Sequence, residues 1–138
     1  MAPTVSDVLT PDVVSISATK TVGDAAQLMR QADIGTVVVT EGGRLVGLVT
    51  DRDLVVRVLA TGGGPDLPVG QACSEDLVTV SPDDDVADAA RVMAEHTVRR
   101  LPVVSGDRVV GIVSLGDLAV ERDPSSVLGR ISAAEPTD

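Results

Sequence analysis

Two stretches of the chain, GLVTDRDL (residues 47–54) and GIVSLGDL (residues 111–118), have the same outline. In each stretch a glycine is followed by two apolar residues, a hydroxyl residue and, three positions further on, an aspartate before a leucine. Short apolar runs of this kind are typical of buried strands. The abrupt change to polar residues marks the strand end, and its recurrence indicates that the chain contains two copies of one unit.

The repeat extends well beyond these two stretches. A shift of 64 positions aligns residues 5–56 with residues 69–120 without a gap, as expected for a tandem duplication. The intervening stretch TGGGPDLP (61–68) is rich in Gly and Pro, which predicts a linker. We therefore expect repeat 1 at residues 1–60, a linker at 61–68, repeat 2 at 69–123 and a C-terminal tail at 124–138.

Each copy predicts the same order of elements. Residues 13–16 and 77–80 are short apolar runs typical of strands, and each is followed by an N-capping signature and an amphipathic helix. Two further strands come next, joined at EGGR (41–44) and SGDR (105–108), where glycine favours a hairpin. A second helix begins after each Thr/Ser-x-x-Asp pattern. The expected fold is α+β, with the order β-α-β-β-α in each repeat.

The composition excludes several classes of function. A formal net charge of −10 repels phosphate backbones, and a chain without aromatic residues cannot stack bases, so no nucleic-acid partner is expected. No apolar run approaches the roughly 20 residues of a membrane span, so no membrane partner is expected either. The first residues lack the basic start and apolar core of a signal peptide. We expect a cytoplasmic protein.

No catalytic or metal-binding residue is predicted. His96 is the only histidine, and it has no partners at the spacing of metal ligands. Cys73 is the only cysteine and is better explained as a small core residue than as a nucleophile. Because the sequence shows no nucleophile–base pair, we expect that the chain is not an enzyme and requires no cofactor.

The patterns Thr50-x-x-Asp53 and Ser114-x-x-Asp117 have two interpretations. In the first, each is a capping box that closes the start of a helix. In the second, each is part of a ligand site. The hydroxyl, the free amides at a helix start and Arg52 would then favour a phosphate, and the carboxylate would accept hydrogen bonds from the vicinal hydroxyls of a ribose. Both interpretations stay open at this point.

A tandem pair of β-α-β-β-α units with such strand ends resembles the cystathionine-β-synthase (CBS) domain family. The resemblance covers residues 3–123 and is carried by GLVTDRDL and GIVSLGDL together with EDLVTVSPDDDVADAARVM and HTVRRLPVV. It implies two tandem CBS repeats that are related by pseudo-two-fold symmetry and packed through their sheets. The stand-alone pair is similar to small bacterial stress-associated CBS proteins.

The resemblance implies a regulatory module that senses AMP, ADP, ATP or S-adenosylmethionine in clefts between the repeats. Asp53 and Asp117 would bind ribose hydroxyls, and Thr50 and Ser114 would meet the phosphate or the sugar edge. Other ligand-binding positions are implied for the backbone near Val14 and Val78, for the aliphatic walls Ile34, Val37, Val98 and Leu101, and for the phosphate-facing Arg52, Arg99 and Arg100.

The two copies differ where a phosphate would bind. Repeat 2 has Arg99-Arg100-Leu101-Pro102, whereas repeat 1 has Gly35-Thr36-Val37-Val38 at the matching positions, so the two sites need not bind equally. The alternative is a stress-associated dimeric scaffold whose clefts bind no nucleotide. In both cases we expect a homodimer that covers an apolar helix face. The identity of any regulated protein partner is left open.

Overall fold

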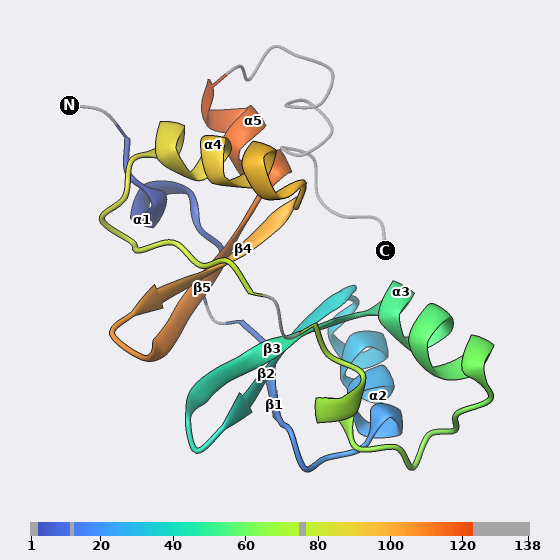
Figure 1. Cartoon of the computed structure of the whole chain (residues 1–138). Coiled ribbons are helices and arrows are strands. Elements are labelled where there is room, and N and C mark those ends of the chain that lie inside the picture. Colours follow the sequence, from blue (N-terminus) through green and yellow to red (C-terminus); the bar gives the residue numbers. More distant parts are fainter. Residues whose placement is uncertain (1–2, 12, 75–76, 123–138) are drawn as a thin grey trace. The chain divides into compact units, whose positions relative to one another are not determined.

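The computed structural model describes residues 3–11, 13–74 and 77–122, with side chains up to Ala119. The chain divides into two compact units, which Figure 1 shows. Among the described residues, 13–74 and 77 form the repeat-1 unit, and 3–11 together with 78–122 form the repeat-2 unit. The tail predicted at 124–138 lies outside the described residues.

The repeat-1 unit contains a three-stranded sheet and several helices. Its elements are β1 (Ser15–Ser17), α2 (Val22–Ala32), β2 (Thr36–Glu41), β3 (Arg44–Thr50), α3 (Asp51–Asp53), η1 (Leu54–Val58), η2 (Leu59–Thr61) and η3 (Val69–Gln71). β1 pairs with β2 in parallel, and β2 pairs with β3 in antiparallel. The hairpin predicted at 41–44 is confirmed. Gly42 and Gly43 have φ angles of 60° and 83°, the left-handed values of a tight two-residue turn.

The helix predicted after β3 is not a regular α-helix. Only Asp51–Asp53 are α-helical, after which Leu54–Val58 form a π-helix and Leu59–Thr61 a 3₁₀-helix. The segment ends at Gly62, whose φ angle of 84° makes it a left-handed C-cap. Three aliphatic side chains of this segment lie on the surface: Val55 (56% exposed), Val56 (47%) and Leu59 (64%).

The repeat-2 unit contains a two-stranded sheet and several helices. Its elements are α1 (Val5–Val8), α4 (Val86–His96), β4 (Arg100–Ser105), β5 (Arg108–Ser114) and α5 (Leu115–Arg122). β4 and β5 form the antiparallel hairpin predicted around SGDR. Gly106 provides its turn with a φ angle of 67°.

The strand predicted at 77–80 is wrong, and Pro102 is the physical reason. In the repeat-1 unit the N–H of Val38 donates to the carbonyl of Val14 over 2.9 Å and helps to align β1 with β2. Pro102 occupies the position that matches Val38, and proline has no N–H to donate. The segment therefore pairs with β4 only through an isolated parallel bridge between Val80 and Val103.

Each unit has its own aliphatic core. In the repeat-1 unit Val22, Ala25 and Met29 of α2 are buried against the sheet, and Val86, Ala89 and Met93 of α4 do the same in the repeat-2 unit. Of the stripes that the sequence predicts, Ala25, Met29, Ala89 and Met93 are buried, whereas Ala26 and Ala32 are exposed. No buried polar or charged residue is found in the described part of the chain, so burial of apolar surface stabilises both units.

The first segment of each repeat, here called its lead-in segment, packs on the other repeat. Val5, near the start of repeat 1, has no exposed surface and belongs to the core of the repeat-2 unit; its N–H donates to the carbonyl of Asp84 over 2.8 Å. Val69, at the matching position at the start of repeat 2, is equally buried in the repeat-1 core and donates to the carbonyl of Lys20 over 2.7 Å. The compact units thus differ from the sequence repeats 1–60 and 69–123, and neither repeat completes its core alone.

Gly111 lets the N-terminal lead-in segment cross β5. Thr10 and Ile112 exchange two backbone hydrogen bonds of 2.8 and 3.0 Å. A Cβ atom on Gly111 would lie 2.7 Å from the carbonyl oxygen of Thr10 and 2.8 Å from Cδ1 of Leu9. No such separation is tolerated between non-bonded atoms, so this position requires glycine.

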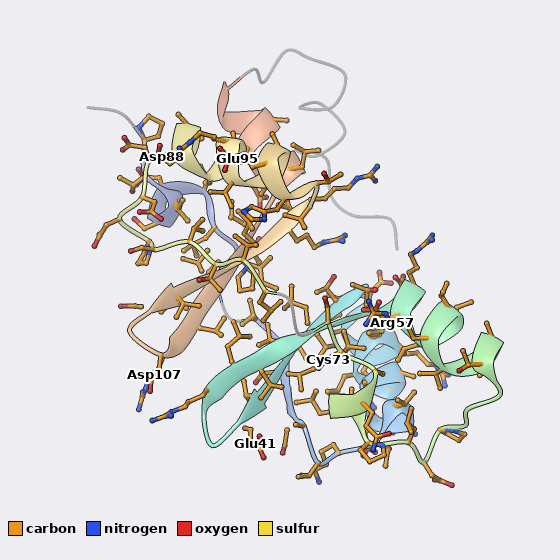
Figure 2. All side chains as sticks on the ribbon, in the orientation of Figure 1. Glu41, Arg57, Cys73, Asp88, Glu95 and Asp107 are labelled. Carbon is orange, nitrogen blue, oxygen red and sulfur yellow. The ribbon has the colours of Figure 1, made fainter. Side chains whose placement is uncertain are left out.

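Gly47 has the same role in β3. The N–H of Ser74 donates to the carbonyl of Leu48 over 2.9 Å. A Cβ atom on Gly47 would overlap the carbonyl oxygen of Ser74 and would lie 2.8 Å from Sγ of Cys73. Figure 2 shows Cys73 beside β3, where it is 4% exposed within the repeat-1 core. The glycine that β3 and β5 share therefore allows another segment of the same chain to lie close against each strand.

Candidate functional site

The Thr50-x-x-Asp53 pattern forms a complete capping box at the end of β3. The N–H of Asp53 donates to Oγ1 of Thr50 over 3.1 Å, and the N–H of Thr50 donates to Oδ2 of Asp53 over 2.9 Å. Ser114 and Asp117 make the same pair of hydrogen bonds at the end of β5, with lengths of 3.1 and 2.9 Å. The capping interpretation of both patterns is confirmed.

A third box of this kind occurs on α2, away from the strand ends. The N–H of Asp24 donates to Oγ1 of Thr21, and the N–H of Thr21 donates to Oδ2 of Asp24, both over 3.1 Å. The hydrogen bond from the backbone of Thr21, and then that from its side chain, lower the pKa of Asp24. Asp24 makes the same capping hydrogen bonds away from the strand ends, and it is therefore a control for Asp53 and Asp117.

The two strand-end aspartates differ in their second carboxylate oxygen. Oδ1 of Asp53 lies 3.5 Å from Nε of Arg57, one helical turn further on, and the Asp53 side chain is 17% exposed. Figure 2 shows Arg57 on the helical segment after β3. Oδ1 of Asp117 has no hydrogen-bond or ion-pair partner among the residues that the structure describes. A carboxylate oxygen without a partner keeps its full capacity to accept hydrogen bonds.

The start of β2, beside the Thr50 box, is acidic and narrow. The N–H of Asp51 donates to the carbonyl of Gly35 over 3.0 Å. Oδ2 of Asp51 lies only 3.1 Å from the place that a Cβ of Gly35 would take. Next to it, Oγ1 of Thr36 is buried and has no hydrogen-bond partner in the described part of the chain. Arg52 is exposed, and its N–H donates to Oδ1 of Asp51 over 2.8 Å.

The start of β4, beside the Ser114 box, is basic instead. The N–H of Leu115 donates to the carbonyl of Arg99 over 2.7 Å, and Arg100 lies opposite Ser114 in the β4–β5 register. Both arginine side chains are exposed. Neither forms a salt bridge with any carboxylate that the structure describes. The backbone therefore places two available guanidinium groups at the strand end that also holds Asp117.

The backbone near Val14 and Val78 also differs between the units. The carbonyl of Val14 accepts from Val38 over 2.9 Å. Pro102 stands at the position of repeat 2 that matches Val38, so the carbonyl of Val78 lacks the corresponding N–H donor. No other backbone donor takes its place in the described chain. Pairing resumes only at Val80, whose N–H donates to the carbonyl of Pro102 over 3.1 Å.

Two of the four predicted aliphatic wall residues are core residues. Val37 and Leu101 have no exposed surface and lie in the cores of their units. Ile34 and Val98 are only partly buried and pack against the same cores from the side. Val37 shares its core with Val39, and Leu101 shares its core with Val103, as expected for residues two apart on a strand; the residues between them are buried as well.

One open pocket lies apart from all of the predicted site residues. It has a volume of about 370 Å³ and lies along β1 and α2 of the repeat-1 unit, where its lining includes Lys20, Gln27 and Gln31. No sequence pattern pointed to it, because its polar residues come from an exposed strand edge and an exposed helix face that carry no motif. The structure thus separates this pocket from the residues of the two boxes.

Comparison with known proteins decides the family. The CBS domain family matches residues 5–60 and residues 69–122. The chain belongs to the CBS domain family. A curated CBS relative, the CBS domain-containing protein YhcV of Bacillus subtilis, is 42% identical over 118 residues, which are 86% of this chain and 84% of that protein.

Other CBS proteins agree in sequence and in structure. Hypoxic response protein 1 of Mycobacterium tuberculosis is 36% identical over 84% of this chain and 82% of its own length. A crystal structure of Hypoxic Response Protein I with two coordinated zinc ions has a TM-score of 0.78 at 36% identity and covers 86% of this chain and 98% of that one. A putative signal-transduction protein with CBS domains from Burkholderia ambifaria has a TM-score of 0.79 at 27% identity, over 90% and 96% of the two chains. The predicted α+β fold with two CBS repeats is confirmed.

The properties in these names belong to the relatives. Within the described residues, no group of three or more His, Cys, Asp and Glu side chains is placed to hold a metal ion. A hexameric CBS-CP12 protein from bloom-forming cyanobacteria, with a TM-score of 0.78 at 31% identity over 90% of this chain and 74% of that one, shows that CBS pairs also occur in larger assemblies. No described helix is long and apolar enough to cross a membrane.

Proposed function

We propose that this CBS pair is a regulatory module that binds an adenosine-containing ligand: AMP, ADP, ATP or S-adenosylmethionine. The observation that carries the proposal is that the main chain engages only one oxygen of Asp53 and one oxygen of Asp117. Such a carboxylate caps its helix and can still accept from the vicinal hydroxyls of a ribose. Family membership supports the proposal, because CBS domains commonly bind adenosine-containing ligands and one relative is named a putative signal-transduction protein.

The remaining contacts follow from what is accessible around the boxes. Arg52, Arg99 and Arg100 are exposed cations that can meet a phosphate. Ile34 and Val98 are the partly buried aliphatic side chains that can contact a base. The role proposed for these groups is binding, and binding would act by favouring one conformation of the protein over another.

Binding is tested by thermal unfolding of the protein with AMP, ATP or S-adenosylmethionine at near-millimolar concentration. A ligand present at about 100 times its Kd stabilises the folded state by about 2.7 kcal/mol, so we expect the midpoint to rise with at least one of the three. Inorganic phosphate, which lacks both the ribose and the base, is the control and should leave the midpoint unchanged. Unchanged midpoints with all three adenosine compounds would count decisively against the proposal.

A stress-associated interaction protein is the second candidate, and the exposed apolar segment favours it. Val55, Val56 and Leu59 form an uncovered aliphatic face on η1 and η2, and an identical face on a second copy covers it economically. The similarity to hypoxic response protein 1 fits a role in stress. A homodimer is common to both candidates, whereas a scaffold would do without the nucleotide.

The homodimer is tested by light scattering on the purified protein. We expect the mass of a dimer for the wild type and of a monomer for the double variant Val55→Ser, Leu59→Ser, because burial of these side chains drives association. The variant Ala60→Ser, which changes an exposed residue of the same segment by little, should remain dimeric. A monomeric wild type at the concentrations used, or a dimeric double variant, would refute this interface.

A further inference from the structure

We infer that the open edge of β1 binds an extended peptide that carries an acidic side chain. The peptide adds a strand beside Ser15 and Ser17 and places its carboxylate between the N–H of Ser17 and the ammonium group of Lys20. Three observations carry the inference: an open strand edge, a pocket beside it and a comparison with the matching positions of repeat 2. The inference does not depend on an adenosine ligand.

The outer side of β1 has unpaired backbone groups. The sheet order is β1-β2-β3, so β1 has a neighbouring strand on one side only (Figure 1). On that side the carbonyl of Val14 and the N–H of Ala18 bond to β2. Because the peptide groups of alternate residues point to opposite edges of a strand, the N–H groups of Ser15 and Ser17 face outward, and neither has an acceptor in the described chain. Such an edge can pair with a strand of another chain.

A pocket of about 370 Å³ adjoins this edge. Its lining contains Ser15, Ser17 and Lys20 on the strand side and Gln27 and Gln31 on α2. All five residues are exposed. Lys20 is the only lysine of the chain, and it forms no salt bridge with any carboxylate that the structure describes. The pocket therefore offers an ammonium group and two amide groups to a side chain of an added strand.

Repeat 2 shows which chemical group pairs with the outward N–H. Ser81 matches Ser17, and Asp84 matches Lys20. The N–H of Lys20 donates to the Ser17 carbonyl over 3.0 Å. The N–H of Asp84 does the same to the Ser81 carbonyl over 3.1 Å, so the turn has the same form in both copies. In repeat 2, Oδ2 of Asp84 also accepts from the N–H of Ser81 over 2.8 Å.

A carboxylate of the chain itself thus closes the outward N–H in repeat 2. In repeat 1 a lysine stands at that position, so a carboxylate that pairs with the N–H of Ser17 has to come from another molecule. The ammonium group of Lys20 favours such a carboxylate, because hydrogen bonds between charged groups are stronger than those between neutral ones.

The charges on the neighbouring helix differ in the same direction. In repeat 2, Asp88 pairs with Arg91 over 3.2 Å. At the matching positions of repeat 1, Asp24 is held in its capping box and Gln27 is neutral. Lys20 is therefore the one cation in the lining of the pocket, and no arginine of α2 lines the pocket beside it.

An extended peptide fits this edge better than a small carboxylate does. A free carboxylate can pair with Ser17 and Lys20 but leaves the N–H of Ser15 unpaired, whereas an added strand pairs with alternate residues along the edge. Because β1 has only three residues, we expect weak binding. The net charge of −10 opposes an acidic partner at long range, so titrations use about 0.15 M salt, where the Debye length is about 8 Å.

Fluorescence anisotropy tests the inference with a labelled, C-amidated hexapeptide, Thr-Val-Thr-Asp-Val-Thr. The matched peptide has Asn in place of Asp, and N-acetylaspartate provides the same carboxylate without a strand. We expect one Asp peptide per chain, bound about tenfold more tightly than the Asn peptide, which lacks the charge-assisted hydrogen bond. N-acetylaspartate at the concentration of the peptide should not displace it.

Lys20→Asp gives repeat 1 the arrangement of repeat 2. We expect its carboxylate to accept from the N–H of Ser17, to abolish peptide binding and to slow the hydrogen exchange of that amide. Lys20→Gln should weaken binding of the Asp peptide about tenfold and leave binding of the Asn peptide unchanged. Arg30→Asp makes the same change of charge as Lys20→Asp at an exposed residue of α2 outside the pocket lining. It should bind the peptide as the wild type does.

Four results would overturn the inference: equal binding of the Asp and Asn peptides, displacement by N-acetylaspartate, unchanged peptide binding in Lys20→Asp, or no binding to the wild type at near-millimolar protein. Thermal unfolding of both Lys20 variants distinguishes lost binding from lost folding. All of these measurements are made without a nucleotide, so their failure would leave the proposed adenosine ligand untouched.

Discussion

Gly111→Ala is expected to destabilise the protein by about 3 kcal/mol, because overpacking at a closed position forces the backbone apart. The added methyl group would lie 2.7 Å from the carbonyl oxygen of Thr10 and 2.8 Å from Leu9. The hydrogen bonds between Thr10 and Ile112 hold the crossing segment in place, so it cannot move away without losing them. In a thermal unfolding experiment the loss corresponds to a midpoint lower by roughly 10 °C.

Gly47→Ala should have an effect of the same size, since it meets the Ser74 carbonyl and Cys73 in the other unit. Gly64→Ala is the control, because a Cβ on Gly64 has nothing within 4 Å and the residue has no left-handed φ angle. We expect that substitution to be neutral. If Gly111→Ala and Gly64→Ala unfolded at the same temperature, the crossing of the lead-in segment over β5 would be wrong.

Leu101→Ala should also be strongly destabilising, by about 2–5 kcal/mol, the usual range for leucine in a closed core. Leu101 has no exposed surface and packs in the repeat-2 core. The sequence suggested Leu101 as a ligand contact. Truncation of a residue that only lined a ligand cleft would change the free energy of unfolding much less. Chemical denaturation of the variant and the wild type without ligand measures the loss directly.

Leu115→Ala removes the same atoms from a residue that is 40% exposed at the start of α5. It should change the free energy of unfolding by about 0.5 kcal/mol or less, as most surface substitutions do. A Leu101→Ala variant that were as stable as Leu115→Ala would show that Leu101 is not in a closed core. Leu101 would then return to the list of ligand contacts.

Local patterns predicted the local structure of this chain well. The glycines of EGGR and SGDR indicated two hairpins, and both form with left-handed glycines in the turns. The spacing of Ala25 and Met29 indicated the buried face of α2. Three capping boxes were readable because each depends on two side chains three residues apart, whereas Asp85, at the start of α4, makes no side-chain capping hydrogen bond.

Features that depend on distant parts of the chain were not predicted. The strand at 77–80 fails because of Pro102, which lies beyond a whole helix in the sequence. The exchange of lead-in segments between the units was also missed, since Val5 and Val69 look like ordinary members of their own repeats. The shared Gly47 and Gly111 were the available signal: a strand glycine indicates close approach of another chain segment.

The sequence predicted the positions of the candidate site. The structure shows that these positions differ in burial and in their hydrogen-bond and ion-pair partners. Thr50, Asp53, Ser114 and Asp117 lie at strand ends as expected. The pattern alone could not show that Arg57 occupies the second oxygen of Asp53. Nor could it show that Val37 and Leu101 point into the cores, because the face of a strand residue depends on the register of pairing.

The most direct test of nucleotide sensing is an AMP titration followed by amide chemical shifts of the labelled, full-length protein. The account predicts shifts that saturate at the strand-end residues of the capping boxes, Thr50, Asp53, Ser114 and Asp117. A spectrum that stays unchanged up to near-millimolar AMP, or changes confined to the pocket along β1 and α2, would contradict it.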